Sequence, residues 1–256
     1  MSNNKPTIAM VHGAFAESSS WDPVIECLEH HGTPIVASRE RPYRDIVAIA
    51  NPLRSVAGDA AYVRDVLASI DGPIVLVGHS YGGTVITEAA AGNDAVVALV
   101  YVAAFAPDTG ESAFELSTMF PGSTLGDALM AYPVATGGDE FAIRKDVFHH
   151  QFAADVSPRQ AALMAATQRP VTQAALAEGL PTERPAWKDT PSWFVYGDQD
   201  LNIPAELHRF VAARAGSQGT TEIAGASHAL SVSEPEAVAS TILAAVRASA
   251  PELTPA

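Results

Sequence analysis

The segment GHSYGG, residues 78–83, places one hydroxyl side chain, that of Ser80, among glycines. The apolar run before it predicts a buried strand over 73–78, and the residues after it predict a helix over 83–92. The flanking glycines let the chain reverse without Cβ clashes, which lifts the Ser80 side chain clear of the backbone, and the first N–H groups of the helix favour negative charge beside it. A serine at such a junction is typical of a nucleophile, although a helix N-cap is the plainer alternative.

A serine hydroxyl is a weak nucleophile and needs a base to take its proton. His228 lies in the segment ASHAL, just after the last predicted strand, where a parallel sheet presents its C-terminal edge. We therefore predict that His228 is the base. The other histidines are less well placed, because they lie on predicted helices, in a long insertion, beside Ser80 or in the loop after the first strand: His12, His30, His31, His79, His149, His150 and His208.

The base in turn needs an acid that orients it. The segment GDQDLNIP, after the fifth predicted strand, offers Asp198 and Asp200. Asp198 directly follows the strand and is placed to stabilise the turn, whereas Asp200 lies further along the loop, before a helix that begins near Pro204. We favour Asp200, which gives the chain order Ser80, Asp200, His228.

The loop after the first predicted strand, with the sequence HGAF, can expose a backbone N–H toward Ser80. Ala14 is the best candidate for this donor and Phe15 the next. The N–H of Tyr81, the residue after the serine, would be the second donor of a site that binds a negatively charged oxygen. The simpler alternative is that this His-Gly pair only ends a strand.

Strand-like and helix-like segments alternate along the chain. The expected strands are short apolar runs, of the kind that helices bury on both faces, over 7–11, 33–38, 73–78, 95–104, 191–197 and 220–225. The expected helices cover 19–32, 55–70, 83–92, 204–216 and 235–250, and a loop rich in Arg and Pro precedes the second of them. This order predicts an α/β fold with a doubly wound, mostly parallel six-stranded sheet.

Residues 107–190 interrupt this alternation. They contain amphipathic helical patches, such as 157–168, but no convincing strand. An insertion of this length exceeds the usual crossover connection and is typical of a lid or a binding element. We expect a helical cap over one end of the sheet, inserted after the fourth predicted strand into a core made of residues 1–106 and 191–256.

The chain of 256 residues has 29 acidic and 15 basic side chains, and its net charge of −14 disfavours binding to nucleic acid or to a membrane surface. No apolar stretch reaches the ~18 residues of a membrane span and no secretory signal is visible, so we expect a cytoplasmic protein.

The single cysteine, Cys27, cannot form an internal disulfide. We expect no metal or other cofactor, because adjacent residues such as His149 and His150 rarely bind one ion. The expected partner is a small molecule, and the sequence leaves a homodimer open.

The motifs HGAF, GHSYGG, DQDLNIP and ASHAL, in this order and with an insertion between the fourth and fifth strands, resemble the α/β-hydrolase superfamily. The six-strand pattern, which starts at the His-Gly-Ala strand, looks like the methylesterase and hydroxynitrile-lyase branch of that superfamily. The resemblance covers most of the chain. It implies a catalytic triad of Ser80, Asp200 and His228, with Ala14 and Tyr81 as the oxyanion donors.

Two positions are similar to the esterases of that branch and differ from its lyases. The hydroxynitrile lyases carry a threonine after the histidine of the first loop and a lysine after the catalytic histidine, whereas this chain has Gly13 and Ala229. The resemblance therefore implies ester hydrolysis through an acyl-enzyme, with cyanohydrin cleavage disfavoured. Cofactor-free haloperoxidases and C–C hydrolases use the same triad, and some relatives only bind a ligand, so these alternatives stay open.

Large apolar side chains near the motifs and in the insertion suggest a cavity for a small to medium, largely apolar ester. The candidates near the motifs are Phe15, Phe105 and Leu201, and those in the insertion are Met119, Phe120, Phe148, Phe152 and Met164. Each of them could equally be an ordinary core residue.

Overall fold

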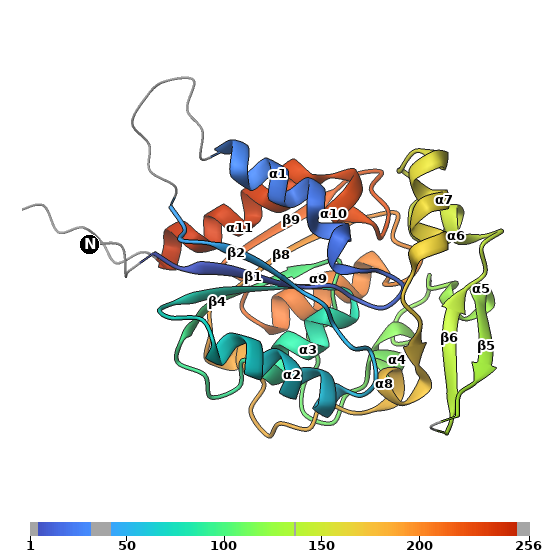
Figure 1. Ribbon diagram of the computed structural model, residues 1–256, viewed down its shortest axis with the longest axis horizontal. Coiled ribbons are helices and arrows are strands. Elements are labelled where there is room, and N and C mark those ends of the chain that lie inside the picture. Colours follow the sequence, from blue (N-terminus) through green and yellow to red (C-terminus); the bar gives the residue numbers. More distant parts are fainter. Residues whose placement is uncertain (1–4, 32–41, 136, 250–256) are drawn as a thin grey trace, which may run out of the picture.

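A six-stranded sheet forms the centre of the molecule. The computed structural model describes residues 5–31, 42–135 and 137–249. The strand order is β2-β1-β3-β4-β8-β9, and every neighbouring pair is parallel (Figure 1). The strands are β1 (Thr7–Val11), β2 (Ile46–Ile49), β3 (Ile74–His79), β4 (Val96–Val102), β8 (Ser192–Gly197) and β9 (Gly219–Ile223). The prediction of an α/β fold with a doubly wound parallel sheet is confirmed.

The strand β2 corrects one part of the sequence interpretation. The expected strand over 33–38 falls outside the described residues, whereas β2 lies in the segment interpreted as a loop rich in Arg and Pro. The loop interpretation is wrong for 46–49, where the residues Ile-Val-Ala-Ile pair in parallel with β1. This run has only four residues, and three of them are half-buried at the sheet edge, so it gives a weak apolar signal.

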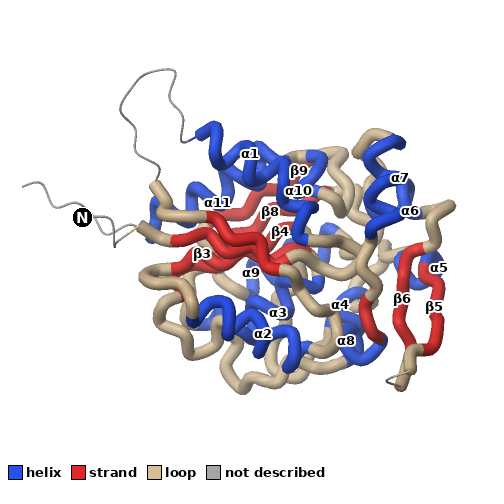
Figure 2. The backbone as a smooth tube through the Cα atoms, viewed as in Figure 1, coloured by secondary structure: helices blue, strands red, loops and turns tan. Residues whose placement is uncertain are grey.

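Helices cover both faces of the sheet (Figures 1 and 2). One face carries α1 (Asp22–His31) and α11 (Pro235–Ser249), together with the short η1 (Ser18–Trp21) and α10 (Leu230–Ser233); the other carries α2 (Val56–Ala68), α3 (Tyr81–Ala89) and α9 (Ala205–Arg214). Successive strand residues point to opposite faces of the sheet. Ile8 and Met10 therefore pack in the apolar core under α1 and α11, whereas Ala9 and Val11 pack in the core under α2, α3 and α9. Burial on both faces explains why the strands are continuous apolar runs. None of the helices in the described residues has the length and apolar character that crossing a membrane requires.

Residues 107–190 contain a small antiparallel sheet as well as helices. The helices and strands of this segment are α4 (Ala113–Ser117), α5 (Leu125–Ala128), β5 (Leu129–Pro133), β6 (Asp139–Ile143), α6 (Phe148–Phe152), α7 (Pro158–Thr167), β7 (Val171–Thr172), α8 (Gln173–Ala177) and η2 (Ala186–Lys188). The expectation that this segment holds no strand is wrong, because β5, β6 and β7 pair in that order. The turn between β5 and β6 contains Gly137 and Gly138 with φ of 96° and 78°, a glycine pair typical of hairpins. The helix expected over 157–168 is present as α7, and the Ser157 hydroxyl caps it.

Both ends of this segment meet at Arg214 of α9. The Arg214 guanidinium donates to the Glu111 carboxylate at 2.7 and 2.8 Å and to the Ala106 carbonyl at 2.8 Å. It also lies 5.4 Å from the ring of Trp187, whose Nε1–H donates to the Pro107 carbonyl at 2.8 Å. The chain therefore leaves the central sheet and returns to it at one place, where a single cation contacts both crossings.

Helix α3 approaches the segment after β4 so closely that Gly83 has no room for a side chain. An added Cβ would lie 2.1 Å from the Phe105 carbonyl oxygen and 2.8 Å from the Ala104 Cβ. We expect Gly83→Ala to lower the free energy of unfolding by about 1–3 kcal/mol, because the backbone must shift to relieve the overlap. Urea denaturation followed by circular dichroism measures this change.

The matched control for this variant is Gly126→Ala in α5, where an added Cβ meets no heavy atom within 4 Å. The control should keep or slightly raise the free energy of unfolding, because alanine restricts the unfolded chain. Equal losses in the two variants would contradict the steric explanation.

Candidate active site

Ser80 lies on the turn between β3 and α3. Its φ of +54° is in the left-handed region, which is unfavourable for a residue with a side chain. Backbone hydrogen bonds hold the turn: the Ser80 N–H donates to the Val102 carbonyl at 3.2 Å, and the Ser80 carbonyl accepts from Gly83 at 2.9 Å and Phe105 at 3.2 Å. The Ser80 hydroxyl makes no capping hydrogen bond to α3, so it does not act as the helix cap that was the plainer alternative.

Glycines bring three chain segments into contact around Ser80. A Cβ on Gly78 would lie 2.7 Å from the carbonyl oxygen of Gly82, and one on Gly82 would lie 2.4 Å from the carbonyl oxygen of Val11. A Cβ on Gly13 would lie only 2.5 Å from the Ser80 Cβ. The loop after β1 therefore touches the serine turn directly, at a distance that only glycine permits.

His228 and Asp200 form a buried hydrogen-bonded pair. The His228 Nδ1 lies 2.7 Å from Asp200 Oδ2, and the two side chains are 1% and 0% exposed. Because a carboxylate only accepts, Nδ1 carries the proton and Nε2 is left free to act as a base. His228 and Ser80 line the same cavity. The structure thus brings together the three residues that the sequence pointed to.

The Asp200 carboxylate is held ionised in a dry environment. Its Oδ1 accepts the N–H groups of Asn202 at 2.8 Å and Ile203 at 2.9 Å. Burial alone would raise the pKa of Asp200, but His228 and His208 outweigh it, so the pKa of this carboxyl lies well below its ordinary value. The group is therefore a permanent anion beside His228 at neutral pH.

Asp198, the other candidate acid, has a different hydrogen-bond partner. Its Oδ1 accepts the N–H of Gly225 at 2.7 Å, and it makes no contact with His228. It therefore joins the end of β8 to the turn after β9, as expected for a turn residue.

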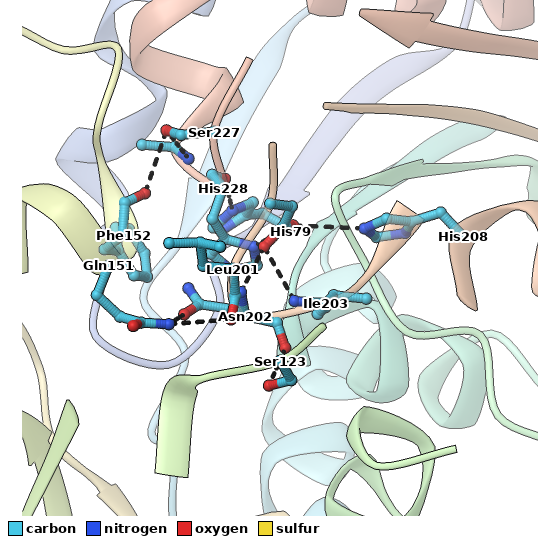
Figure 3. A network of polar contacts seen from close by, with 12 residues as sticks. His79, Ser123, Gln151, Phe152, Leu201, Asn202, Ile203, His208, Ser227 and His228 are labelled. Atoms are coloured by element: carbon cyan, nitrogen blue, oxygen red, sulfur yellow. Dashed lines mark hydrogen bonds and ion pairs between the residues drawn. The ribbon is translucent and has the colours of Figure 1, made fainter. Parts of the chain in front are cut away.

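The segment carrying His228 is fixed by its neighbours (Figure 3). The N–H of Ser227 donates to Asp155 at 3.0 Å, and the Ser227 hydroxyl donates to the same carboxylate. The ring of Phe152 lies edge-on to His228, with centroids 4.9 Å apart. His79 Nε2 donates to the His228 carbonyl at 3.0 Å, and burial lowers the pKa of His79 to about 3, so this ring is a neutral structural donor.

The segment carrying Asp200 is fixed from the insertion side. Gln151 of α6 donates from Nε2 to the Leu201 carbonyl at 3.0 Å and to the Asn202 side-chain oxygen at 2.9 Å (Figure 3). The Ser123 hydroxyl donates to the Asn202 carbonyl at 3.0 Å. Residues of the 107–190 segment therefore contact both the acid segment and the histidine segment.

The loop after β1 places Ala14 and Phe15 beside Ser80. Both residues line the cavity, as Tyr81 does. The N–H of Phe15 already donates to the Arg169 carbonyl at 3.0 Å, which removes Phe15 as an oxyanion donor. His12 holds the start of the loop, because its Nδ1 donates to the Gly13 carbonyl at 2.9 Å. Burial lowers the pKa of His12, so it too is a neutral structural residue.

Tyr81 is anchored by a buried acid that the sequence did not reveal. Its hydroxyl donates to Asp59 Oδ2 at 3.0 Å, and the Asp59 carboxylate also accepts the N–H of Arg54 at 3.0 and 3.1 Å. Burial raises the pKa of both Tyr81 and Asp59. The backbone of Tyr81, at the first position of α3, is thus tied to α2 through its side chain.

A cavity of about 400 Å³ opens at Ser80. Of the predicted cavity residues, Phe15, Phe105 and Phe120 lie on its wall, whereas the other five lie elsewhere: Leu201, Met119, Phe148, Phe152 and Met164. Phe148 stacks on Phe152 with centroids 5.1 Å apart, and Phe152 in turn contacts His228. Met119 is 46% exposed. Met164 is partly buried and packs against the apolar core that includes residues of α2, α3 and α9.

The remaining cavity wall comes from residues that sequence patterns did not single out. On the insertion side they include Phe114, Leu125, Leu129 and Leu176, and on the core side Asn202 and Ile203. Leu125 begins α5 and Leu129 begins β5, and both elements are too short to give a clear apolar pattern. Within the described residues, no group of three or more His, Cys, Asp or Glu side chains is arranged so that it could hold a metal ion.

Solved structures with the same fold include several named as esterases or hydrolases. Polyneuridine aldehyde esterase has a TM-score of 0.75 and 20% sequence identity, with 94% of this chain and 99% of that chain covered. A pyrethroid hydrolase from Sphingobium faniae JZ-2 has a TM-score of 0.70 and 21% identity, covering 95% and 98% of the two chains. A methylesterase from Arabidopsis has a TM-score of 0.71 and 17% identity, covering 94% and 99%. These likenesses establish a shared fold.

Sequence comparison identifies the family. No curated protein sequence matches the chain. A sequence model of the alpha/beta hydrolase family matches residues 8–241, from the second residue of β1 into α11, and so spans every segment of the site just described. This chain belongs to the alpha/beta hydrolase family.

Proposed function

We propose that this chain is a serine hydrolase that cleaves a small to medium, largely apolar carboxylic ester through an acyl-enzyme. The observation that carries the proposal is the His228–Asp200 pair, joined at 2.7 Å, in which His228 lines the same cavity as Ser80. The names of the similar structures, which include an aldehyde esterase and a methylesterase, support the same class of reaction.

In the acylation half-reaction, His228 Nε2 takes the proton of the Ser80 hydroxyl as its oxygen attacks the ester carbonyl carbon. The buried Asp200 anion stabilises the imidazolium that forms. The tetrahedral intermediate then collapses: the C–O bond to the alcohol breaks, and His228 returns the proton to the leaving oxygen. Ser80 is left as an ester of the acyl group.

In the deacylation half-reaction, a water molecule replaces the alcohol. His228 takes a proton from the water as its oxygen attacks the acyl carbon, and the proton passes to the Ser80 oxygen when the acid leaves. Each half-reaction develops a negative carbonyl oxygen. The N–H groups of Ala14 and Tyr81 are the proposed donors to it, because the N–H of Phe15 is already occupied by Arg169.

Two positions argue against cyanohydrin cleavage as the activity. The resemblance to the hydroxynitrile lyases would require a threonine at 13, yet a Cβ there would lie 2.5 Å from the Ser80 Cβ. Position 229, where those lyases carry a lysine, is a buried alanine. The chain offers no cation at either position for a developing cyanide ion.

The charge of the cavity wall favours neutral substrates. No Lys or Arg is among the described residues that line it, and its acidic side chain is Asp127, which is exposed. Arg144 donates to the Asp127 carbonyl at 2.8 Å but lies off the wall, beside Asp146. An anionic substrate would lose hydration without gaining a partner, so we propose that the substrate is an uncharged ester.

The Ser80→Ala variant tests the nucleophile. With methyl and p-nitrophenyl esters of short acids, the wild type should turn over and the variant should lose about 10⁴–10⁶-fold in kcat, because the acyl-enzyme cannot form. Quenched-flow mass spectrometry should detect the acyl group on the wild type. A variant with full turnover would refute the assignment.

The two candidate acids are compared as Asp200→Asn and Asp198→Asn. We expect Asp200→Asn to lower kcat by about 10³–10⁴-fold, because the neutral amide no longer selects the Nδ1–H form of His228. Asp198→Asn should stay within about 3-fold, since its partner is the N–H of Gly225 and not the histidine. A larger loss at 198 would reverse the assignment.

Dimethyl adipate and its monomethyl ester form a matched pair for the charge of the substrate. We expect kcat/KM for the neutral diester to exceed that for the anionic monoester by about 10-fold or more, as measured by methanol release. Asp127→Asn should raise the rate for the monoester by about 2–3-fold at low salt and leave the diester unchanged. Equal rates for the two esters would contradict the proposed neutral preference.

A further inference from the structure

Asp200 has a second histidine as a neighbour. His208 of α9 points its Nε2 at Asp200 Oδ2, at 3.4 Å, and this is the same oxygen that His228 contacts at 2.7 Å (Figure 3). The His208 side chain is 1% exposed, and it does not line the cavity at Ser80. The catalytic scheme above gives this buried ring no role.

His208 completes the hydrogen bonding of the carboxylate. Asp200 Oδ1 accepts two backbone N–H groups, from Asn202 and Ile203, and Oδ2 accepts the two rings. A carboxylate has about four acceptor positions, so all of them are occupied. Without His208, one acceptor position of Oδ2 would face the dry interior without a donor, and His228 would be the only side chain that donates to this oxygen.

The ring of His208 is itself held in place. It stacks on the ring of Tyr196 in β8, with centroids 4.8 Å apart and planes 15° apart. The Tyr196 hydroxyl donates to Glu222 of β9 at 3.2 Å, and Arg209 donates to the same carboxylate at 2.9 Å. A chain of contacts thus runs from the protein surface through two rings to the acid of the site.

The charges around the pair leave His208 as a neutral donor. Burial lowers the pKa of His208, although Asp200 opposes the shift. The other titratable groups packed around these side chains are His79 at the end of β3, whose pKa is also lowered by burial, Tyr196 on β8, which stacks on His208, and Asp155, which accepts from Ser227 next to His228. Asp200 is therefore the anion that the two histidines share.

We propose that His208 is a positioning residue for the triad: its Nε2–H holds Asp200 Oδ2 in line with His228 Nδ1 and takes up part of the carboxylate charge. This inference rests on the proposed ester hydrolysis, in which Asp200 orients His228. It assigns to α9 a direct part in the site, alongside the three segments that carry the triad itself.

The matched variants are His208→Gln and His208→Met, which have nearly the same shape and differ in whether they can donate to Asp200. We expect His208→Met to lower kcat by about 10-fold with KM within about 2-fold, because a misplaced His228 slows both half-reactions. His208→Gln should restore most of kcat.

A readout without substrate separates this inference from the proposed function. The downfield proton resonance of the His228–Asp200 hydrogen bond should shift in His208→Met and stay near the wild-type position in His208→Gln. If the wild type hydrolyses no ester but this pattern holds, the proposed function fails and the positioning role stands. If the wild type is active and both variants lose kcat equally, with the resonance unmoved, His208 only fills space and the inference is overturned. Circular dichroism of each variant checks that it is folded.

Discussion

The site depends on backbone segments that approach one another more closely than side chains allow. Glycine at 13, 82 and 83 lets the loop after β1, helix α3 and the segment after β4 meet around one residue, Ser80. The left-handed φ of that residue is the geometric result, since the chain must pass from strand to helix within this contact. The same contact brings Ala14 and Tyr81 to the wall of the cavity that Ser80 also lines, so the proposed nucleophile and its proposed oxyanion donors share a single cause.

A buried carboxylate imposes the second requirement. Removing an anion from water costs several kcal/mol, which is recovered only if every acceptor position is filled. Asp200 meets this condition with two N–H groups of its own segment and two imidazoles. Its own segment is tied to the 107–190 insertion through Gln151, and the segment of its partner His228 is tied there through Asp155. The insertion is therefore part of the support of the site and also a wall of its cavity.

The sequence was sufficient to predict those site residues whose position is determined by a single local segment. Ser80, Asp200 and His228 each follow a strand, and strand ends of a parallel sheet meet at one edge, so their convergence could be inferred without coordinates. Features that depend on contacts between distant segments could not be inferred. His208 and Asp59 gave no signal, because a helical His and a helical Asp are ordinary until their partners at 200 and 81 are known.

In the insertion, too, the features that depend on the path of the chain could not be predicted from the sequence. Phe120 and Phe148 are equivalent in sequence terms, yet Phe120 lies on the cavity wall and Phe148 stacks on Phe152, because the path of the chain between α4 and α6 decides which side each faces. The strands β5 and β6 are short and partly exposed, so their apolar pattern was weak, and a pair of glycines was the better signal. The strand β2 was missed for a similar reason, as a four-residue run at the sheet edge.

The unequal make-up of the cavity has a consequence for mutational freedom. Behind the serine, the backbone segments are in close contact, and at Gly13 and Gly83 even one added methyl group would overlap the neighbouring chain. The opposite wall is built from side chains of the insertion, including Phe114, Leu125 and Leu176, which can be exchanged for smaller or larger ones. A library that randomises this wall would vary the substrates accepted, while the geometry that acts on the carbonyl carbon stayed constant. The wall side chains can thus be varied while the glycine contacts around Ser80 stay unchanged.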